Sequence, residues 1–517
     1  MTVKPLLLPL CALSLGLMAC GISTRRALPP AATPPPRATV ASPGDGEMAT
    51  PGTSEAVSPT ESASPLETMD PPRVDVPLVS DAVYGENNGM RFARIPTDDC
   101  ANLTATPVVV GQWLVYPMHT ARRCRQNVGS YDRVLLGYHM GEGKLYLLRQ
   151  GEAGEAPLLY DPTGGTLYWN VTFGGTTLLL EPRTFELRRK VSVGITADSA
   201  GTVLDGLYYF GTVNGPDPAC QQPLNPKCGS LFALDAEGNV VYQRTTPDGF
   251  RAWIGTSATT DGQFLYFGSA AQTVGQKSGD ETEYLYGCSV IKTDARLNIM
   301  ASFDPGDLAC YALPFEGANE DSVSGEVVPD GSGLWVQYVR PNDGRMKSAL
   351  YRLDLDLKEQ CRVEFDFEAR SQAAGFYAGP TVDVQGNAYI AVTVPDPQAV
   401  RRGLLVRVTP ACQATTLAQV PGAFAQASPT LADDQYVLFA TDGRLGVYNL
   451  EGELIREYSL ASQARVLASP VIHEGVVYVV QEDATLNVID DSGLEGYGSA
   501  IWPRYRRDNF GSASLGQ

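Results

Sequence analysis

An apolar-aromatic triplet recurs eight times along the chain, and a turn usually precedes it. The copies are Leu114-Val115-Tyr116, Leu167-Tyr168-Trp169, Leu207-Tyr208-Tyr209, Leu265-Tyr266-Phe267, Leu334-Trp335-Val336, Ala388-Tyr389-Ile390, Val437-Leu438-Phe439 and Val477-Tyr478-Val479. Their centres lie 40 to 69 residues apart. Short strands repeated about every 40 to 50 residues are typical of β-propeller blades. The pattern predicts an all-β propeller with eight blades of four antiparallel strands, or seven blades as the alternative.

The seventh copy shows the repeating unit in its shortest form. Four short apolar segments, residues 428–431, 436–440, 445–449 and 454–458, are separated by turn residues. Asp442-Gly443 is typical of a tight two-residue hairpin between the second and third of them. Long stretches with a 3.6-residue apolar period are missing, so we expect few helices.

Composition and charge agree with a large β-rich domain and exclude some partners. The 517 residues are 44% hydrophobic and include 52 glycines. Two or three domains would be usual at this length, but blades bury their faces only against neighbouring blades, which favours a single ring. The net charge of −19 argues against nucleic acid, whose binding needs clustered cations. It also disfavours tight adsorption to anionic lipid headgroups.

The first twenty residues are typical of a secretion signal. Lys4 precedes an apolar run at residues 6–17, and Leu17-Met18-Ala19-Cys20 resembles the bacterial lipobox, which implies lipidation of Cys20. The alternatives are an ordinary secretory signal or an uncleaved membrane helix, although the run is shorter than the roughly 20 residues that a span needs. The resemblance implies anchoring by acyl chains alone. In the lipoprotein sorting rule, Asp after the lipidated cysteine favours retention in the inner membrane. This chain has Gly21 at that position, so the resemblance implies the outer membrane or cell surface instead.

A spacer follows at residues 21–80, and it is rich in Pro, Ala, Ser and Thr. It has too few aromatic and branched apolar residues to offset its ordering entropy, so we expect it to be disordered. Extended proline-rich chain measures about 3.1 Å per residue, which would place the folded domain on the order of 100 Å from the membrane. We assign residues 81–517 to a single propeller domain.

Eight cysteines remain after Cys11 in the signal and Cys20 are set aside, and their even number favours disulfides in an oxidising compartment. They are Cys100, Cys124, Cys220, Cys228, Cys288, Cys310, Cys361 and Cys412. Their places in the meander suggest pairing in that consecutive order, with Cys361–Cys412 joining the same turn of adjacent blades. No metal site is expected, because no Cys-x-x-Cys occurs and the three histidines are scattered.

Three motifs carry a resemblance to a known family. They are the unit Ser-Pro-Val-Ile-His-Glu-Gly-Val-Val-Tyr-Val-Val from Ser469, the Leu-x-Ala-Leu-Asp-x-x-Gly motif from Leu231, and the Trp-Pro-x-Tyr-x-x-Asp segment from Trp502. Over residues 100–514 the chain resembles the pyrroloquinoline-quinone-like β-propeller superfamily. A lipid-anchored ring of eight blades further resembles the outer-membrane assembly lipoproteins of Gram-negative bacteria. That resemblance implies a non-catalytic scaffold of the cell envelope.

Insertions are confined to one face of the predicted ring and to about half of its blades. Between second and third strands they fall at residues 214–229, 271–287, 340–347 and 395–402, and the connectors 246–253, 304–321 and 366–376 are long. Binding residues usually lie on loops held by a rigid scaffold, and aromatic residues and Arg are enriched at interface hot spots. The candidates are Phe250, Arg251, Trp253, Tyr311, Phe315, Arg370, Phe376 and Tyr377. They predict a surface for an envelope protein or polysaccharide; alternatively, they pack the loops onto the ring.

The alternative function is that of a quinoprotein-type oxidoreductase. Family resemblance would then imply an adjacent Cys-Cys pair beside the cofactor and a calcium site with a catalytic Asp, but the chain has no such cysteine pair. Residues 235–238 and 383–386 are typical of β-turns, and the acidic run 278–283 lacks the ligand spacing of a calcium loop. Hydrolase, Walker and zinc-protease motifs are missing as well. We therefore expect no catalytic residues and no cofactor.

The last blade lacks a clean fourth strand after residues 490–493. An open ring would leave unpaired strand edges, which proteins avoid. We expect chain from one terminus to complete this blade, either residues 83–96 or the tail that contains Trp502. Trp502 and Tyr505 are then expected between the first and last blades, with Asp508 at the seam.

The anchor hypothesis makes a direct prediction. Cys20→Ala should give an unprocessed precursor or a released soluble protein, because the acyl chains are the expected membrane attachment. Metabolic labelling with a fatty-acid analogue measures this. Absence of label on the unaltered protein would contradict the hypothesis.

Overall fold

The computed structural model describes residues 76–97, 101–103, 105–120, 133–152, 156–171, 175–194, 200–212, 230–245, 253–254, 257–278, 281–303, 326–342, 345–368, 379–394, 401–425 and 427–515. All of them belong to one compact unit, Met69–Gln517. The signal, Cys20 and nearly all of the spacer lie outside these residues. The described part contains strands and turns but no helix, and so none that could span a membrane.

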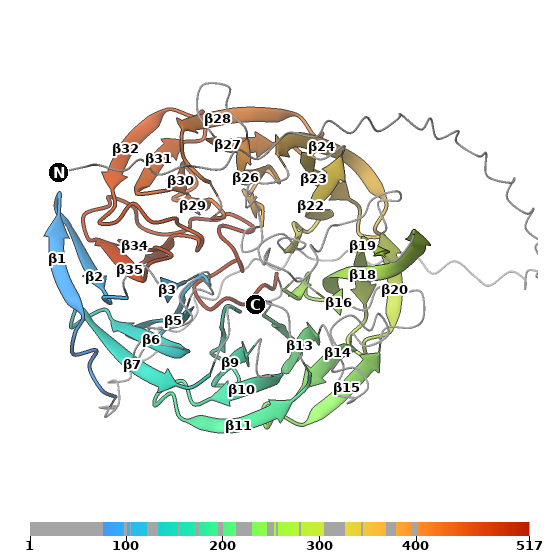
Figure 1. The fold of residues 1–517 in the computed structure, drawn as a ribbon, viewed down its shortest axis with the longest axis horizontal. Coiled ribbons are helices and arrows are strands. Elements are labelled where there is room, and N and C mark those ends of the chain that lie inside the picture. Colours follow the sequence, from blue (N-terminus) through green and yellow to red (C-terminus); the bar gives the residue numbers. More distant parts are fainter. Residues whose placement is uncertain are drawn as a thin grey trace, which may run out of the picture. The chain divides into compact units, whose positions relative to one another are not determined.

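Eight sheets follow one another around a ring (Figure 1). Blade one has β3 (Ala101–Asn102), β4 (Val108–Val110), β5 (Trp113–Thr120), β6 (Val134–His139) and β7 (Lys144–Gln150). Blade two has β8 (Leu159–Asp161), β9 (Thr166–Val171), β10 (Thr176–Leu180) and β11 (Leu187–Ser192). Blade three has β12 (Thr202–Leu204), β13 (Leu207–Thr212), β14 (Ser230–Leu234) and β15 (Val240–Thr245). Blade four has β16 (Trp253–Ile254), β17 (Thr259–Thr260), β18 (Leu265–Ser278), β19 (Glu281–Thr293) and β20 (Ile299–Phe303).

The remaining blades repeat the same antiparallel meander. Blade five has β21 (Val327–Pro329), β22 (Leu334–Asn342), β23 (Arg345–Leu353) and β24 (Glu359–Glu368). Blade six has β25 (Thr381–Val382), β26 (Ala388–Val394), β27 (Arg402–Val408) and β28 (Ala414–Pro421). Blade seven has β29 (Thr430–Ala432), β30 (Tyr436–Thr441), β31 (Arg444–Asn449) and β32 (Leu454–Ser459). Blade eight has β33 (Val471–His473), β34 (Val476–Val480) and β35 (Thr485–Ile489), followed by β2 (Met90–Arg94) and β1 (Val83–Asn87). The predicted all-β propeller of eight blades is confirmed.

Each apolar-aromatic triplet forms part of the second strand of its blade. Trp169, Tyr266 and Trp335 are fully buried, although they belong to three different blades. The triplets are unbroken apolar runs because blades stack face to face and bury both sides of the sheet, as parallel sheets covered on both faces also do. The repeat therefore reflects inter-blade packing.

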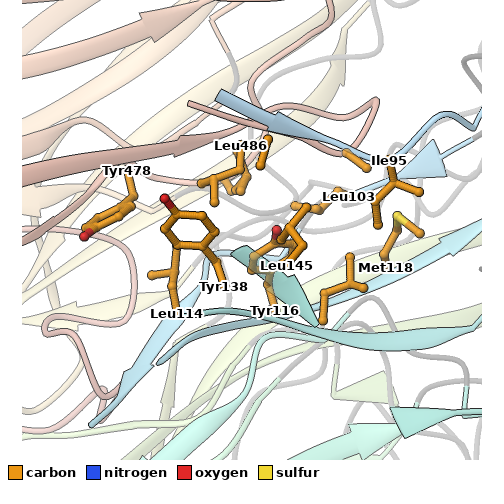
Figure 2. Packing of buried hydrophobic residues seen from close by; sticks show 14 of the residues in the cluster. Ile95, Leu103, Leu114, Tyr116, Met118, Tyr138, Leu145, Tyr478 and Leu486 are labelled. Atoms are coloured by element: carbon orange, nitrogen blue, oxygen red, sulfur yellow. The ribbon is translucent and has the colours of Figure 1, made fainter. Parts of the chain in front are cut away.

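The hydrophobic core is divided into eight clusters in the described residues, one at each boundary between adjacent blades. Figure 2 shows the cluster between blade eight and blade one, where Tyr478 and Leu486 face Leu114 and Tyr138. Ile95, directly after β2, lies in the same cluster. This boundary between the ends of the chain is thus packed like the other seven.

A recurring turn joins the third and fourth strands of several blades. In blade three, Asp235 accepts the backbone N–H of Asn239, and in blade four Asp294 accepts those of Arg296 and Asn298. Asp and Asn side chains stabilise such turns by bonding to backbone groups two to four residues on. The predicted turn at residues 235–238 is confirmed, because Gly238 donates to the carbonyl of Asp235. The predicted turn at residues 383–386 is also confirmed by the bond from Gly386 to the carbonyl of Asp383, although it joins the first and second strands of blade six.

The ring is closed at its rim by the N-terminal hairpin β1–β2. β2 pairs antiparallel with β35, with Ala93 opposite Leu486, and becomes the fourth strand of blade eight. Just before the hairpin, Val79 donates to the carbonyl of Leu145 in β7, so this segment covers the outer edge of blade one. Of the two expected candidates, residues 83–96 therefore supply the missing strand.

The C-terminal tail, residues 494–515, lies instead along the inner strands of the ring, and the C-terminal end is near the centre in Figure 1. The expected position of Trp502 and Tyr505 between the first and last blades is wrong. Trp502 pairs with Val382 in blade six, and Tyr505 hydrogen-bonds Ser257 in blade four. Asp508 caps its own turn by accepting the N–H groups of Phe510 and Ser512. Because β2 already occupies the seam, the tail has no edge to complete there.

Closure by β2 predicts an asymmetry between two substitutions in one hairpin. Ala93→Asp should lower the free energy of unfolding by about 3 kcal/mol or more, because it places an unpaired charge in the seam cluster. Val83→Asp adds the same charge to β1, where the side chain is 51% exposed, and should change stability little. Urea unfolding of both variants measures this, and equal effects would contradict closure by β2.

Candidate functional site

In a four-stranded meander, the turns between second and third strands share one end of the ring with the connectors between blades. The turns at the other end stay short, from two residues at Gly111-Gln112 to six at residues 181–186. We call the first end the elaborated face. Of the insertions that the sequence indicated, those at residues 271–287 and 340–347 prove to be extensions of the blade strands, whereas residues 214–229 and 395–400 lie outside the described residues.

In blade four the second and third strands continue far beyond the core as a long hairpin. β18 ends at Ser278, eleven residues after Phe267, whereas β30 in blade seven ends two residues after its triplet. The pairing continues outward through Ala271↔Gly287 to Ser278↔Glu281. At about 3.4 Å per residue, the segment beyond Ala270 reaches roughly 27 Å. The 271–287 insertion is therefore a projecting β-ribbon.

Blade five extends three strands in the same direction. β22 continues to Asn342, which pairs with Arg345 of β23, and Arg345 in turn pairs with Glu368 at the end of β24. Because three paired strands share the extension, it is supported by two ladders of backbone hydrogen bonds. Blades four and five together form the most prominent elaboration in the described residues.

Blades six and seven meet on this face in a small cation–aromatic cluster. The Arg401 guanidinium lies over the Phe424 ring, 3.4 Å from its centroid, and forms an ion pair of 3.4 Å with Asp442. Asp442 also accepts the backbone N–H of Phe424. Burial raises the pKa of the Asp442 carboxyl, while that N–H and Arg401 oppose the rise.

Arg465 extends this cluster to blade eight. Its guanidinium forms two hydrogen bonds of 2.7 Å with Glu482 and lies 6.0 Å from the Phe424 centroid. Both arginines thus have carboxylate partners and share one aromatic ring. A stacked arginine with 31% of its side chain exposed is suited to polar recognition at a protein surface.

The structure describes only part of the predicted binding residues. Phe250, Arg251, Tyr311, Phe315, Arg370, Phe376 and Tyr377 lie outside the described residues. Trp253 lies in β16, whose backbone pairs with Ala270 at the base of the blade-four hairpin. The sequence analysis did not select Arg401, Phe424 or Arg465. The signal that could have found them was an arginine in the 395–402 insertion of blade six, together with Phe424 and Arg465 in the inter-blade connectors of the same face.

One predicted disulfide is present. Cys361 in β24 is bonded to Cys412 in the turn after β27, with 6.0 Å between their Cα atoms. The bond joins blades five and six at their outer strands, as expected from the repeat. Cys100, Cys124, Cys220, Cys228 and Cys310 lie outside the described residues, as does the side chain of Cys288 in β19.

At the ring axis, one buried carboxylate contacts the tail. Glu326, just before β21, accepts hydrogen bonds from the Trp502 indole N–H at 3.0 Å and the Arg506 backbone N–H at 2.9 Å. The Arg506 guanidinium lies 3.8 Å from the same carboxylate, and both side chains are buried. Burial raises the pKa of Glu326, and Arg506 opposes this rise. Within the described residues, no group of three or more His, Cys, Asp or Glu side chains is placed to hold a metal.

No protein-family model and no curated protein matches this chain. Similar solved structures include BamB from Moraxella catarrhalis, which is 13% identical with a TM-score of 0.42 over 78% of this chain and 99% of that one. The computationally designed Ika8 protein is 12% identical, with a TM-score of 0.44 over 75% and 96%. Apo AztD from Citrobacter koseri is 12% identical, with a TM-score of 0.39 over 74% and 95%. With TM-scores below 0.5, none of them assigns a family or a function.

The raised pKa of Glu326 predicts how stability depends on pH. A carboxyl whose pKa is higher in the folded state contributes stability that is complete below its unfolded pKa, near 4.5, and is lost as pH rises through the folded value. Relative to Glu326→Gln, the unaltered protein should therefore become less stable as pH is raised above about 4.5. Thermal unfolding of both proteins across pH 4 to 8 measures the difference, and parallel curves would contradict the prediction.

Proposed function

We propose that the protein is a non-catalytic, lipid-anchored scaffold of the bacterial cell envelope that binds a protein or polysaccharide through the elaborated face. The observation that carries the proposal is the one-sided extension of paired strands in blades four and five. Turns at the opposite end are held to six residues or fewer. Extended strands at one end only indicate a surface shaped for contact.

The extensions have properties that suit a binding surface. Backbone pairing holds the ribbon of blade four together from Leu265 to Ser278, with one register shift between Val274 and Lys277, so less conformational entropy is lost on binding than for an unpaired loop. Arg401 and Asp442 supply a polar centre on the same face. The Arg401 side chain is 31% exposed, so part of its guanidinium can be contacted by a partner while Asp442 and Phe424 hold it in place.

The proposed anchor enters the domain at its rim. The first described residues, beginning at Val76, lead into the segment that pairs with β7 and then into the closing hairpin. A lipidated Cys20 followed by a long polar spacer would tether the ring through this edge. The lipobox-like segment and Gly21 support an outer-membrane or surface location. For the alternative, a quinoprotein-type oxidoreductase, no contact among the described residues provides support.

The proposal is tested by shortening the blade-four ribbon. Ala271 and Gly287 are paired opposite one another, so replacing residues 272–286 with Asn-Gly closes the hairpin with a two-residue turn. We expect an unchanged unfolding temperature, because the inter-blade clusters remain intact. Capture of envelope proteins and polysaccharides by the purified chain should fall at least about tenfold for the specific partner, as expected for loss of interface hot spots.

The matched control alters the opposite end of the neighbouring blade. Asp356→Ser with Lys358→Ser changes two side chains that are 76% and 74% exposed, and it should leave capture unaffected. If the shortened ribbon and the control retain the same partners equally well, binding through the elaborated face is excluded.

A further inference from the structure

We propose that the ring axis is a peptide-binding site, and that its resident ligand is the chain's own C-terminal tail, residues 494–515. The chemistry it recognises is a cationic peptide with a tryptophan and an arginine four residues apart. This inference does not depend on the proposed binding function of the elaborated face.

The tail is bound mainly through its backbone by the inner strands. Val109 of blade one donates to the Asn509 carbonyl at 2.7 Å, and Tyr160 of blade two donates to the Phe510 carbonyl at 2.8 Å. The hydroxyl of Thr202 in blade three donates to the Ser512 carbonyl at 2.7 Å. Such backbone recognition of an extended segment is the mode by which sheets bind peptides.

The other blades complete the contact. Thr260 of blade four donates to the Ala513 carbonyl, Val382 of blade six exchanges two backbone hydrogen bonds with Trp502, and Leu431 of blade seven donates to the Pro503 carbonyl. In blade eight, the Ile472 carbonyl accepts from the Asn509 side chain at 2.8 Å. With Glu326 of blade five, every blade is hydrogen-bonded to the tail.

Glu326 provides the side-chain specificity. Its carboxylate accepts the indole N–H of Trp502 and the backbone N–H of Arg506, and it lies beside the Arg506 guanidinium. That guanidinium also donates to the backbone carbonyls of Gly201 and Gly511. A buried carboxylate is costly unless a cation and hydrogen-bond donors lie beside it. Glu326 therefore selects for a peptide with an indole N–H and a guanidinium four residues apart.

A second buried arginine is held by neutral acceptors. Arg504 is fully buried, and it donates to the Pro107 carbonyl of blade one at 3.0 Å and to the Asn509 side chain at 3.3 Å. Because backbone carbonyls at the inner edge accept these donors, the axis favours a positively charged ligand although the chain as a whole carries a charge of −19.

The tail is a ligand of the ring and supplies no strand to any blade. Blade eight is completed by β2, so each of the eight meanders is intact without residues 494–515. At the junction, Asp491 and Gly493 are exposed, whereas Ser492 and Leu494 are buried. Cutting the chain there removes no strand from a sheet.

The test cuts the folded full-length chain at this junction. A specific protease sequence is inserted after Gly493, the purified protein is cleaved, and gel filtration measures how much tail stays with the ring. We expect the cleaved tail to stay bound. Its dissociation is then followed in the presence of excess synthetic peptide of residues 494–517. Trp502→Phe removes the indole donor to Glu326 and part of the ring packed between blades five and six, so dissociation should be about tenfold faster.

Ile501→Val is the matched control, because it alters the neighbouring side chain without touching a hydrogen bond to Glu326, and its dissociation rate should match that of the unaltered tail. A synthetic competitor peptide with Arg506→Ala should displace the cleaved tail poorly. In this comparison only the peptide is changed, and the cleaved protein is the same in both measurements. Immediate loss of the cleaved tail would overturn the proposal. Equal dissociation rates for the Trp502→Phe and unaltered tails, or equal displacement by both peptides, would also overturn it.

Discussion

Each blade is an apolar sheet that must be covered on both faces, and the whole structure depends on this constraint. A single blade cannot meet it, because second-strand residues such as Tyr266 and Trp335 are fully buried by neighbouring blades. Burial of this kind is worth about 25 cal/mol per Å² of apolar surface. An unclosed ring would expose two such faces at once. The chain therefore devotes its N-terminal hairpin to the seam, where β2 pairs with β35 and Ile95 joins the shared cluster.

The rim and the axis are secured by opposite ends of the chain. The N-terminal hairpin supplies a strand and apolar packing, so its contribution resembles that of any other strand. The C-terminal tail supplies hydrogen bonds and buried charge, centred on Glu326 and Arg506, and its Trp502 and Ala513 also pack in the cluster between blades five and six. A buried ion pair is stable only when both charges keep their partners, since removal of one partner lowers the free energy of unfolding by several kcal/mol. The tail therefore fits the inner strands in two ways: Arg506 pairs with Glu326, and backbone N–H and C=O groups of the tail pair with those of the strands.

The two ends of the ring are free to differ because the eight apolar clusters between blades are formed mainly by the strands. At one end, side-chain bonds such as Asp294 to Asn298 fix short turns. At the other end, strands of blades four and five grow outward without disturbing the clusters beneath them. Addition at this end adds contact surface with little effect on the core, which is the arrangement expected of a scaffold that presents a binding face.

The sequence by itself determined the propeller fold, the second strands and several turns, because these depend on apolar runs and Asp-Gly chemistry within a few residues. It favoured eight blades over the alternative of seven, and the structure decided for eight. The sequence also anticipated the Cys361–Cys412 pair and narrowed the closing strand to two segments. Only the tertiary structure decided which terminus closes the ring, where Trp502 lies, and that Arg401 meets Phe424 and Asp442. These contacts join residues that are 41 positions apart, as in Arg401–Asp442, or 176, as in Glu326–Trp502. Their meeting depends on how blades stack and on the width of the axis, which no local pattern encodes.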